Sequence, residues 1–472
     1  MYILVLESST TSAKAMLYDT ESNTYKVESK AYEFGDMEVG LHDPDHVLSA
    51  TAQLGRELAA GHQIDAIALG GTWHSVMLCD NELKPVTPVY KWSYTGAADL
   101  CKEMREDEEF VNWFYQKTGC MVNATYPYFK LKLLREKGWA LENYKIVDQG
   151  IYNTYNLTGQ LVVTDIVASG MGLMDVRKGQ FDPELLEQLG IGLENLPELV
   201  KYNHPCTLSE EGGKLLGLPP GIPVLPTASD GCLNNVGSGA LKDGIMTFSV
   251  GTSAAIRLAA PAPIIPEVPS TWCYISPKAW LCGAATAGCC NCVDWYKDMA
   301  FGSDVSYSQV EEGFDKLSDE PPVFLPFLFG ERCPGWIDYR LGGFMDLRPT
   351  HTNHDLYHAV LEGVLFNVYQ CYEVLTRVGK VPKRIKLSGG ILQSAYWTQM
   401  AADIFGREIE VDPAENASLM GAATVAMEKL GVIDDLTDME LPVTQIIYPN
   451  PEKRELYLKR YERYKYWYDR SI

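Results

Sequence analysis

The sequence predicts an α/β protein built from two similar halves that meet at a cleft. Strand-like apolar runs alternate with helical patterns along most of the 472-residue chain, which is typical of α/β architecture. A strand–turn–strand unit at the start of the chain recurs near residue 245, and such self-similarity indicates an internal duplication. The length agrees, because domains hold roughly 100–200 residues each.

The repeated unit is a hairpin with a polar tip. Its four predicted strands are residues 2–7, 15–19, 245–250 and 255–259. The tips read SSTTSAK and GTSA; the first ends in the basic residue Lys14, and the basic residue Arg257 follows the second. We place the junction of the two halves near residue 241, which predicts domains at 1–241 and 242–472. A chance match between two short hairpins is the alternative.

Further elements fill the space between and after the hairpins. Strands are predicted at residues 64–71, 222–230, 384–390 and 407–411. Helices are predicted at 45–61, 100–119, 353–378 and 396–405, after residue 230, and from 452 onward. The aromatic residues of the last helix predict that it packs onto the body of the protein. The proline-rich stretches 261–269 and 321–326 are interpreted as surface connections.

Composition excludes several classes of protein. The chain carries 40 basic and 62 acidic side chains, a formal net charge of −22, which argues against binding to nucleic acid. No signal peptide and no apolar run of about 20 residues is visible, so we expect a cytoplasmic protein with no membrane partner. Cys289, Cys290 and Cys292 cluster without a second CxxC or a His pair. Buried, reduced thiols are therefore favoured over a zinc site.

Asp230 is the clearest candidate for chemistry. It ends an apolar strand and precedes a glycine and a helix start, and ligands of open α/β sheets bind beyond the carboxyl ends of strands. A carboxylate there can accept the proton of a substrate hydroxyl. The local pattern fits an ordinary helix N-cap equally well.

Small polar residues mark other candidate ligand contacts. Turns rich in Ser, Thr and Gly can direct several N–H groups and hydroxyls at one phosphate. Gly389 and Gly390 follow a strand, where a nucleotide can lie against bare backbone, although a simple turn explains them as well. His74 follows the strand at 64–71, and a lone histidine there is more often structural than a ligand.

Taken together, these motifs resemble the FGGY carbohydrate kinases of the actin, hexokinase and Hsp70 superfamily, whose domains are ribonuclease H-like. The resemblance covers residues 2 to about 430. The matching segments are ESSTTSAK, GTWHSVM, KWSYTGA, TDIVASGMGLMDV, ASDGCLNNVGSGA, SVGTSAAIR, LPFLFGERCPGW, LEGVLFNVYQ, LSGGILQSAYWTQMAADIF and NASLMGAA. The ASDG, GTSAAIR and WHSVM segments are most similar to gluconate kinases.

The resemblance implies a role for each matching residue. Asp230 corresponds to the general base, and Trp73 and His74 to a pair that contacts the sugar. Glu331 and Arg332 correspond to a GER motif near the cleft. The residues implied for ATP binding are Thr10, Thr11, Lys14, Gly251, Thr252, Gly389, Gly390 and Ser394. The family requires Mg²⁺ on the ATP phosphates, and Glu7 stands at the metal-binding position.

The chain departs from the family pattern at three places. Glu7 and Ser9 stand where an Asp and a Gly usually begin the first phosphate turn. Tyr94 and Gly96 replace an Asp and an Arg on the sugar side. The first change lengthens the arm that carries the metal-binding charge, and the last removes a charged pair. The change at Tyr94 and Gly96 therefore bears on substrate identity more than on catalysis, because Asp230, Lys14 and the second turn are intact.

The leading functional hypothesis is ATP-dependent phosphorylation of a sugar or sugar acid. Gluconate, giving 6-phosphogluconate, is the first candidate, and xylulose or another ketopentose or polyol is the second. Loss of an arginine at position 96 counts against a carboxylate substrate, unless Lys91, Lys130 or Arg332 replaces it. The alternative from another class is a non-catalytic sensor of sugar or nucleotide on the same fold. By analogy with relatives, a homodimer is expected.

Overall fold

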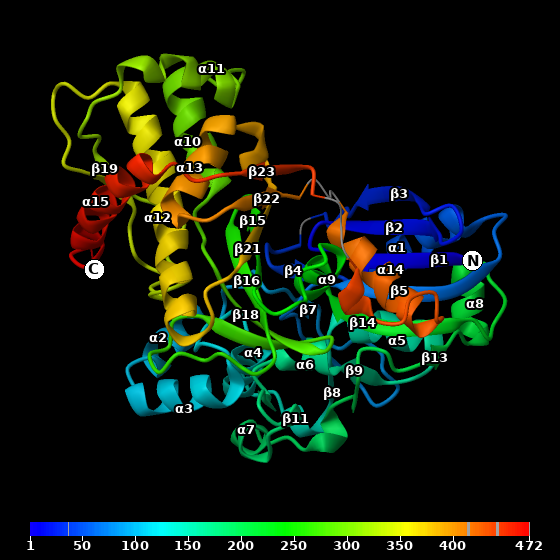
Figure 1. Ribbon diagram of the computed structural model, residues 1–472. Coiled ribbons are helices and arrows are strands. Elements are labelled where there is room, and N and C mark those ends of the chain that lie inside the picture. The colour runs from blue at the N-terminus through cyan, green and yellow to red at the C-terminus, as the bar shows by residue number, and fades with distance from the viewer. Residues whose placement is uncertain (36, 413–415, 440–442, 472) are drawn as a thin grey trace.

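Two mixed β-sheets form the centre of the molecule (Figure 1). The computed structural model describes residues 1–35, 37–412, 416–439 and 443–471. The first sheet has the order β13 (Cys206–Thr207), β14 (Pro223–Ser229), β5 (Ile64–Gly71), β1 (Tyr2–Ser8), β2 (Ser12–Asp19) and β3 (Thr24–Ala31). The second has the order β17 (Trp272–Ser276), β18 (Ala279–Ala285), β16 (Ala254–Ala260), β15 (Ile245–Val250), β21 (Arg384–Gly389), β22 (Ile409–Val411) and β23 (Gln445–Ile447).

The two sheets share one topology. In the first, β1 pairs antiparallel with β2 and parallel with β5, and β14 extends the parallel side. In the second, β15 pairs antiparallel with β16 and parallel with β21, and β22 extends the parallel side. β18 occupies the place of β3, because it pairs antiparallel with the outer strand of the hairpin. The predicted duplication of an α/β unit is therefore confirmed.

Helices cover both faces of the first sheet. Alternate residues of β1 face opposite sides, as a strand requires: Leu4 and Leu6 pack toward α1 (Pro44–Ala59), whereas Ile3 and Val5 join the core on the other face. The side chain of Asp43 caps α1 by accepting hydrogen bonds from Asp45 N and His46 N. On the same side, α8 (Glu210–Leu216) packs against α1 and α5 (Gln149–Thr158).

The opposite face of the first sheet carries a helix from each half of the chain. α9 (Asp230–Gly237) crosses α14 (Ala417–Lys429), and α14 also packs against β1 and β5. The backbones touch where they cross. A methyl group on Gly421 would lie 1.9 Å from the carbonyl oxygen of Leu233, and one on Gly237 would lie 1.9 Å from that of Ala417. Glycine is thus required on both helices at this crossing.

The second half is completed by helices on its outer side (Figure 1). They are α10 (Cys290–Phe301), α11 (Tyr307–Glu311), α12 (Asn353–Val378), α13 (Ala395–Phe405) and α15 (Pro451–Tyr468). α12 is the longest and is buried along most of its length. Tyr457, Tyr461 and Tyr464 of α15 are buried, which confirms that the last helix packs onto the protein.

The remaining elements lie in the chain between strands of the two sheets. The helices among them are α2 (Ala98–Met104), α3 (Glu108–Thr118), α4 (Pro127–Glu136), α6 (Asp165–Ser169) and α7 (Pro183–Gln188). The short strands are β4 (Leu41–His42), β6 (Met77–Cys79), β7 (Val89–Tyr90), β8 (Lys145–Val147), β9 (Val162–Thr164), β10 (Met174–Asp175), β11 (Gln180–Phe181), β12 (Glu198–Val200), β19 (Val323–Leu325) and β20 (Gly343–Met345).

Two local predictions were wrong. The single helix expected at residues 100–119 is two helices, because the carboxylate of Asp107 caps α3 by accepting from Phe110 N and the chain breaks before it. The stretch 321–326 is not a surface connection. Its residues are buried, and β19 lies against α12 and α15.

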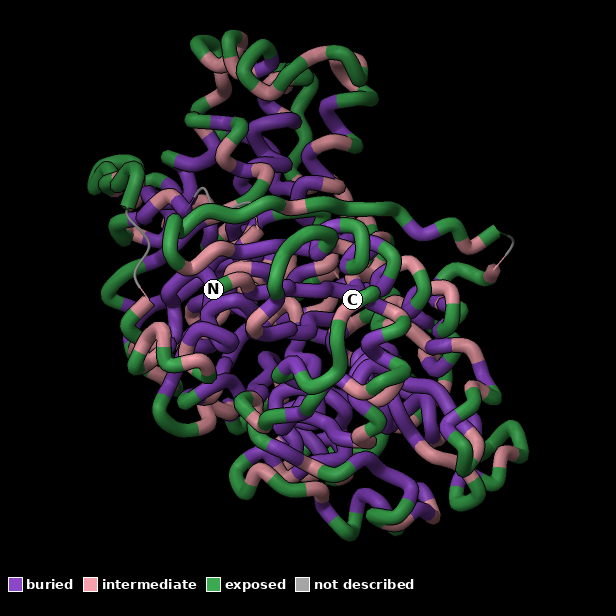
Figure 2. Tube along the Cα trace, turned by 90° about the vertical axis from the view of Figure 1, so that its right-hand side faces the viewer, coloured by how far each residue is buried: buried purple, intermediate pink, exposed green. Residues whose placement is uncertain are grey.

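Buried segments run through the interior of both halves, and exposed segments gather at turns and at the periphery (Figure 2). All twelve cysteines are buried and free, as their scattered spacing predicted. Among the described residues, no helix combines the length and apolar character needed to cross a bilayer.

Candidate active site

A cavity of about 280 Å³ lies between the two sheets, close to both hairpin tips. Its walls come from both halves of the chain. Thr10, Trp73 and His74 belong to the first half, and Ser253, Arg257 and Arg332 to the second. Asp230 faces the same space. The cavity has about the size that a small polar metabolite needs.

Asp230 occupies the first turn of α9, directly after β14. The N-cap of this helix is Ser229, whose hydroxyl accepts from Cys232 N at 3.4 Å. The carboxylate of Asp230 accepts one bond, from Gly231 N at 2.7 Å. The simple N-cap interpretation therefore applies to Ser229, and Asp230 keeps acceptor capacity toward the cavity.

The pKa of Asp230 is raised to about 6. Burial is the largest cause, and the negative charge of Glu7 adds to it, while the Gly231 N–H, Arg257 and Lys14 act in the opposite direction. A carboxylate with a pKa near 6 is a stronger base than an ordinary aspartate and is still mostly ionised at pH 7.

Glu7 and Lys14 face each other across the first hairpin. They are register partners on β1 and β2, and Nζ of Lys14 lies 3.4 Å from Oε1 of Glu7. The hydroxyl of Ser9 donates to the same oxygen at 2.6 Å. Oε2 of Glu7 is buried and has no hydrogen-bond partner among the described residues. One carboxylate oxygen thus remains available for a cation.

Two side chains outside the first hairpin fix its tip through hydrogen bonds to Thr10. Nε1 of Trp92 donates to the hydroxyl of Thr10 at 2.9 Å, and Nε2 of His42 donates to the carbonyl oxygen of Thr10 at 2.9 Å. Burial lowers the pKa of His42 to about 4, so this ring is neutral near pH 7. Thr11 is exposed, and its carbonyl oxygen accepts from Tyr32 N. Of the two threonines, Thr10 lines the cavity.

The second tip is open toward solvent. Gly251 and Thr252 are exposed, and their carbonyl oxygens accept from Cys290 N at 3.1 Å and Asn291 N at 3.4 Å at the start of α10. Gly389 lies beside this tip. It has φ +98°, and a methyl group there would lie 2.1 Å from the carbonyl oxygen of Val250. The structure thus brings Gly389 and its neighbour Gly390 to the second tip.

Ser394 has a different environment from the other predicted ATP-binding residues. Its hydroxyl caps α13 by accepting from Trp397 N at 2.8 Å and donates to Oε1 of Glu311. The side chain is buried, and both contacts are structural. Its predicted contact with ATP would require these bonds to rearrange.

Trp73 and His74 form one wall of the cavity. Nε1 of Trp73 donates to the carbonyl oxygen of Ile166 at 3.0 Å, and Nδ1 of His74 donates to that of Gly170 at 2.7 Å. His74 has φ +68°, and the buried Nζ of Lys130 donates a hydrogen bond to the carbonyl oxygen of His74 at 2.6 Å. Burial lowers the pKa of His74 to about 3. A neutral imidazole, with Nε2 as acceptor, is therefore presented to a ligand.

Sequence reasoning missed several residues of this cavity. Trp92, Trp272 and Tyr274 line it, and Trp272 stacks on Tyr274 with ring centroids 4.6 Å apart. Arg257 was noted only as a residue beyond the second tip. Its signal was a lone charge within the apolar strand β16. The aromatic residues gave no signal, because buried strands are commonly aromatic.

The structure also accounts for Tyr94 and Gly96, which replace a charged pair of the family pattern. A methyl group on Gly96 would lie 2.2 Å from the hydroxyl of Tyr94. The buried ring of Tyr94 stacks edge-on against Tyr90, with centroids 4.9 Å apart. The tyrosine therefore occupies the space in which a side chain at position 96 would lie.

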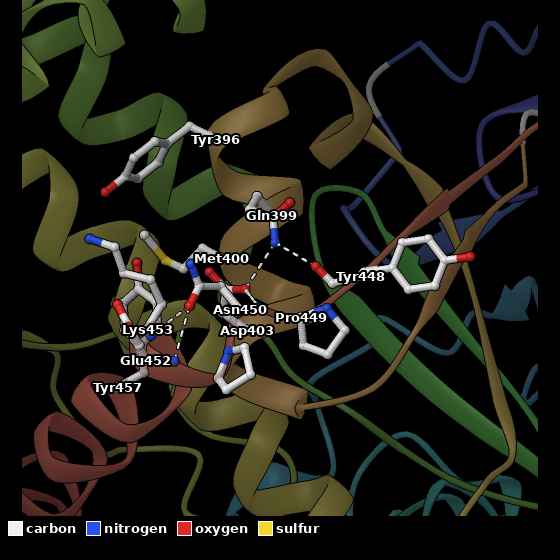
Figure 3. A pocket seen from close by; sticks show the side chains of 11 residues that line it. Tyr396, Gln399, Met400, Asp403, Tyr448, Pro449, Asn450, Glu452, Lys453 and Tyr457 are labelled. Carbon is white, nitrogen blue, oxygen red and sulfur yellow. Dashed lines mark hydrogen bonds between the residues drawn. The ribbon is translucent and has the colours of Figure 1, made fainter.

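A larger groove, of about 800 Å³, lies elsewhere in the second half (Figure 3). It separates α13 from the start of α15. Asp403 accepts from Gln399 at 2.9 Å and from Asn450 N at 2.7 Å, and Gln399 also donates to the carbonyl oxygen of Tyr448. The contacts with Asn450 and Tyr448 join α13 to the segment that leads into α15, and none of the predicted site residues lines the groove.

The described residues contain no cluster of three or more His, Cys, Asp or Glu side chains that could hold a metal alone. Mg²⁺ rarely needs such a cluster, because it usually retains waters and binds one or two carboxylates together with substrate phosphates. The free oxygen of Glu7 and the nearby Asp230 fit that pattern.

Comparison with known proteins agrees with this geometry. Residues 2–237 match the N-terminal domain of the FGGY family of carbohydrate kinases, and residues 246–429 match its C-terminal domain. A gluconokinase of Bacillus licheniformis is 28% identical over 92% of this chain and 88% of its own. A xylulose kinase of Lactococcus lactis is 25% identical over 99% and 96% of the two chains.

A solved structure shows the same fold. The gluconate kinase from Lactobacillus acidophilus superposes with a TM-score of 0.93 at 27% identity, covering 98% of this chain and 96% of that one. Both halves of the chain and their overall fold thus have counterparts in one family. The chain belongs to the FGGY family of carbohydrate kinases, which transfer a phosphoryl group from ATP to a hydroxyl of a sugar.

Proposed function

We propose that this kinase phosphorylates a sugar acid, with gluconate as the acceptor and 6-phosphogluconate as the product. The observation that carries the proposal is Asp230, whose pKa is raised to about 6 in a cavity that also holds two arginines. The gluconokinase and gluconate kinase relatives support the same acceptor. Xylulose is the second candidate, because xylulose kinases are also similar over nearly the whole chain.

In the proposed mechanism Asp230 is the general base. It accepts the proton of the sugar hydroxyl as that oxygen attacks the γ-phosphorus of ATP. The O–P bond to the sugar forms, the bond between the γ-phosphorus and the bridging oxygen breaks, and ADP leaves. Trp73 and neutral His74 orient the sugar.

We propose that the two hairpin tips hold the nucleotide between them. The first tip binds the γ-phosphate through Thr10, Thr11 and Lys14. The second tip contacts the phosphates through Gly251 and Thr252. Backbone N–H groups and hydroxyls in such tips suit anions. Gly389, Gly390 and Ser394 are assigned to the adenosine. The free oxygen of Glu7 would hold Mg²⁺, which neutralises phosphate charge when bound.

The same proposal treats residues 1–241 and 242–472 as two units that close over the substrates. Closure would exclude water and so prevent simple hydrolysis of ATP. We further propose a cytoplasmic location and a homodimer, both by analogy with metabolic kinases of this family.

A substrate panel tests the proposed acceptor. ADP release is measured with Mg-ATP and a series of aldonates, ketopentoses and polyols. We expect the largest kcat/KM with gluconate. A higher kcat/KM with xylulose would show that the acceptor is a ketopentose and not gluconate. Tight ATP binding without ADP release on any acceptor would favour a non-catalytic sensor.

A further inference from the structure

Two arginines reach the cavity without an acidic partner. Arg257 comes from β16 and Arg332 from the loop after β19. Among the described residues, no carboxylate oxygen lies within 4.0 Å of either guanidinium. Glu331 instead pairs with Arg340 at 3.2 Å, and Oε1 of Glu7 lies 3.4 Å from Nζ of Lys14.

Their hydrogen-bonding capacity is largely unused. Nη1 of Arg257 donates to the hydroxyl of Ser249 at 3.1 Å, which fixes the direction of the side chain. Nε of Arg257 and Nε of Arg332 are both buried and have no hydrogen-bond partner in the described part of the chain. A buried charged donor without a partner carries a free-energy cost that a bound anion would relieve.

The two charges act on the same region. Burial lowers the pKa of Arg257, and the positive charge of Arg332 lowers it further, while Asp230 opposes the shift. Nη2 of Arg257 lies 3.4 Å from where a methyl group on Gly231 would stand, next to the base. Arg332 also lowers the pKa of His74, after burial and Lys130. The cavity is therefore locally positive in a chain whose formal net charge is −22.

The remaining walls favour a carbon skeleton over a second anion. Trp73, Trp272 and Tyr274 line them; Trp73 lies 4.9 Å from Tyr274 between ring centroids. Aromatic faces suit the C–H groups of a sugar chain. A ligand with both an apolar C–H surface and one negative charge would pack against the aromatic rings and also pair with the arginines.

We propose that the guanidinium groups of Arg257 and Arg332 form the carboxylate site of this kinase and select a sugar acid over the neutral sugar of the same skeleton. The inference rests on the proposed function and deepens it. Guanidinium groups bind carboxylates through paired, charge-assisted hydrogen bonds. This site supplies a positive charge in place of the family's arginine, which Gly96 replaces in this chain.

Binding measurements without nucleotide test the site directly. Trp73, Trp92 and Trp272 line the cavity, so tryptophan fluorescence reports ligand binding. The ligands are gluconate, gluconamide and glucitol, which share a skeleton but differ in charge. We expect gluconate to bind wild type most tightly, and Arg257→Met and Arg332→Met to weaken gluconate alone by roughly 10- to 100-fold. Arg332→Lys should restore part of the loss.

Controls separate the site from general effects. Arg377→Met changes an exposed arginine at the end of α12 and should leave all three affinities unchanged. Thermal unfolding shows whether each variant is folded. Equal weakening of gluconate and gluconamide would overturn the proposal, as would weaker binding of ATP with unchanged binding of gluconate, because the arginines would then serve the phosphates.

Turnover separates this inference from the proposed function. If wild type phosphorylates sugars but does not distinguish gluconate from gluconamide, the carboxylate site is wrong and the kinase assignment stands. If wild type binds gluconate in preference to gluconamide, yet its highest kcat/KM is with a neutral sugar, the proposed acceptor fails while the carboxylate site is supported.

Discussion

At the scale of single residues, the site is defined by charges held close together in a partly closed space. Burial and the charge of Glu7 raise the pKa of Asp230, whereas Arg257 and Lys14 lower it. The sequence placed Asp230 at the end of a strand and left open whether it was a base or a cap. The contact of Ser229 with Cys232 N shows that the N-cap of α9 is the preceding residue, and the role of Asp230 as a base stays a prediction.

The first prediction concerns pH. Because the base must be ionised, kcat/KM should rise as the pH increases through about 6 and then level off. Arg257→Met removes a charge that lowers the pKa of Asp230, so the acidic limb should move to higher pH. A pH profile with a neutral polyol acceptor measures this without involving a carboxylate. An acidic limb near pH 4, or none, would contradict the assigned environment.

The second prediction concerns the metal. Glu7→Ala removes the free oxygen and should raise the Mg²⁺ concentration for half-maximal activity by roughly tenfold or more. Glu7→Asp should retain Mg²⁺ dependence near that of wild type. Titration of Mg²⁺ at fixed ATP measures both, with the exposed Glu57→Ala on α1 as the matched control. Indifference of the titration to Glu7→Ala would refute the role of Glu7.

At the scale of elements, the spacing of apolar residues predicted those helices whose bounds depend on a regularly repeated buried face. The helix at 353–378 has the predicted bounds, because one long buried face dictates its pattern. The break within 100–119 was missed because it depends on a cap at Asp107 and on contacts of Arg105 with Val122 and Asp338, which lie elsewhere in the fold. Likewise, nothing local shows that 321–326 lies beneath α12.

The third prediction tests the crossing of α9 and α14. Gly421→Ala places a methyl group against the carbonyl oxygen of Leu233, so the helices must separate. We expect a loss of about 1–3 kcal/mol in the free energy of unfolding, which is typical of overpacking, together with a lower kcat, because α9 carries Asp230.

The matched control is Gly343→Ala in β20, where a methyl group meets no atom within 4 Å. Urea unfolding and steady-state kinetics measure both variants. If Gly421→Ala and Gly343→Ala change stability equally, the close crossing does not have the assigned role.

At the scale of the whole molecule, the repeated hairpin in the sequence predicted the duplicated fold. Both hairpins stand in sheets of the same strand order, and both tips approach one cavity. The aromatic wall could not be predicted, since Trp73, Trp272 and Tyr274 come from segments that meet only after folding. α14 is a further example: it lies late in the chain but packs on the first sheet.

The most direct test of the account is turnover by Asp230→Asn with Mg-ATP and the best acceptor. We predict that kcat falls by about 10²–10⁴-fold while the affinity for ATP stays nearly unchanged. Ser229→Ala, which removes the cap of α9, should lower stability by roughly 1 kcal/mol and largely retain kcat. Turnover by Asp230→Asn within a few-fold of wild type would contradict the account, because Asp230 would then be no base.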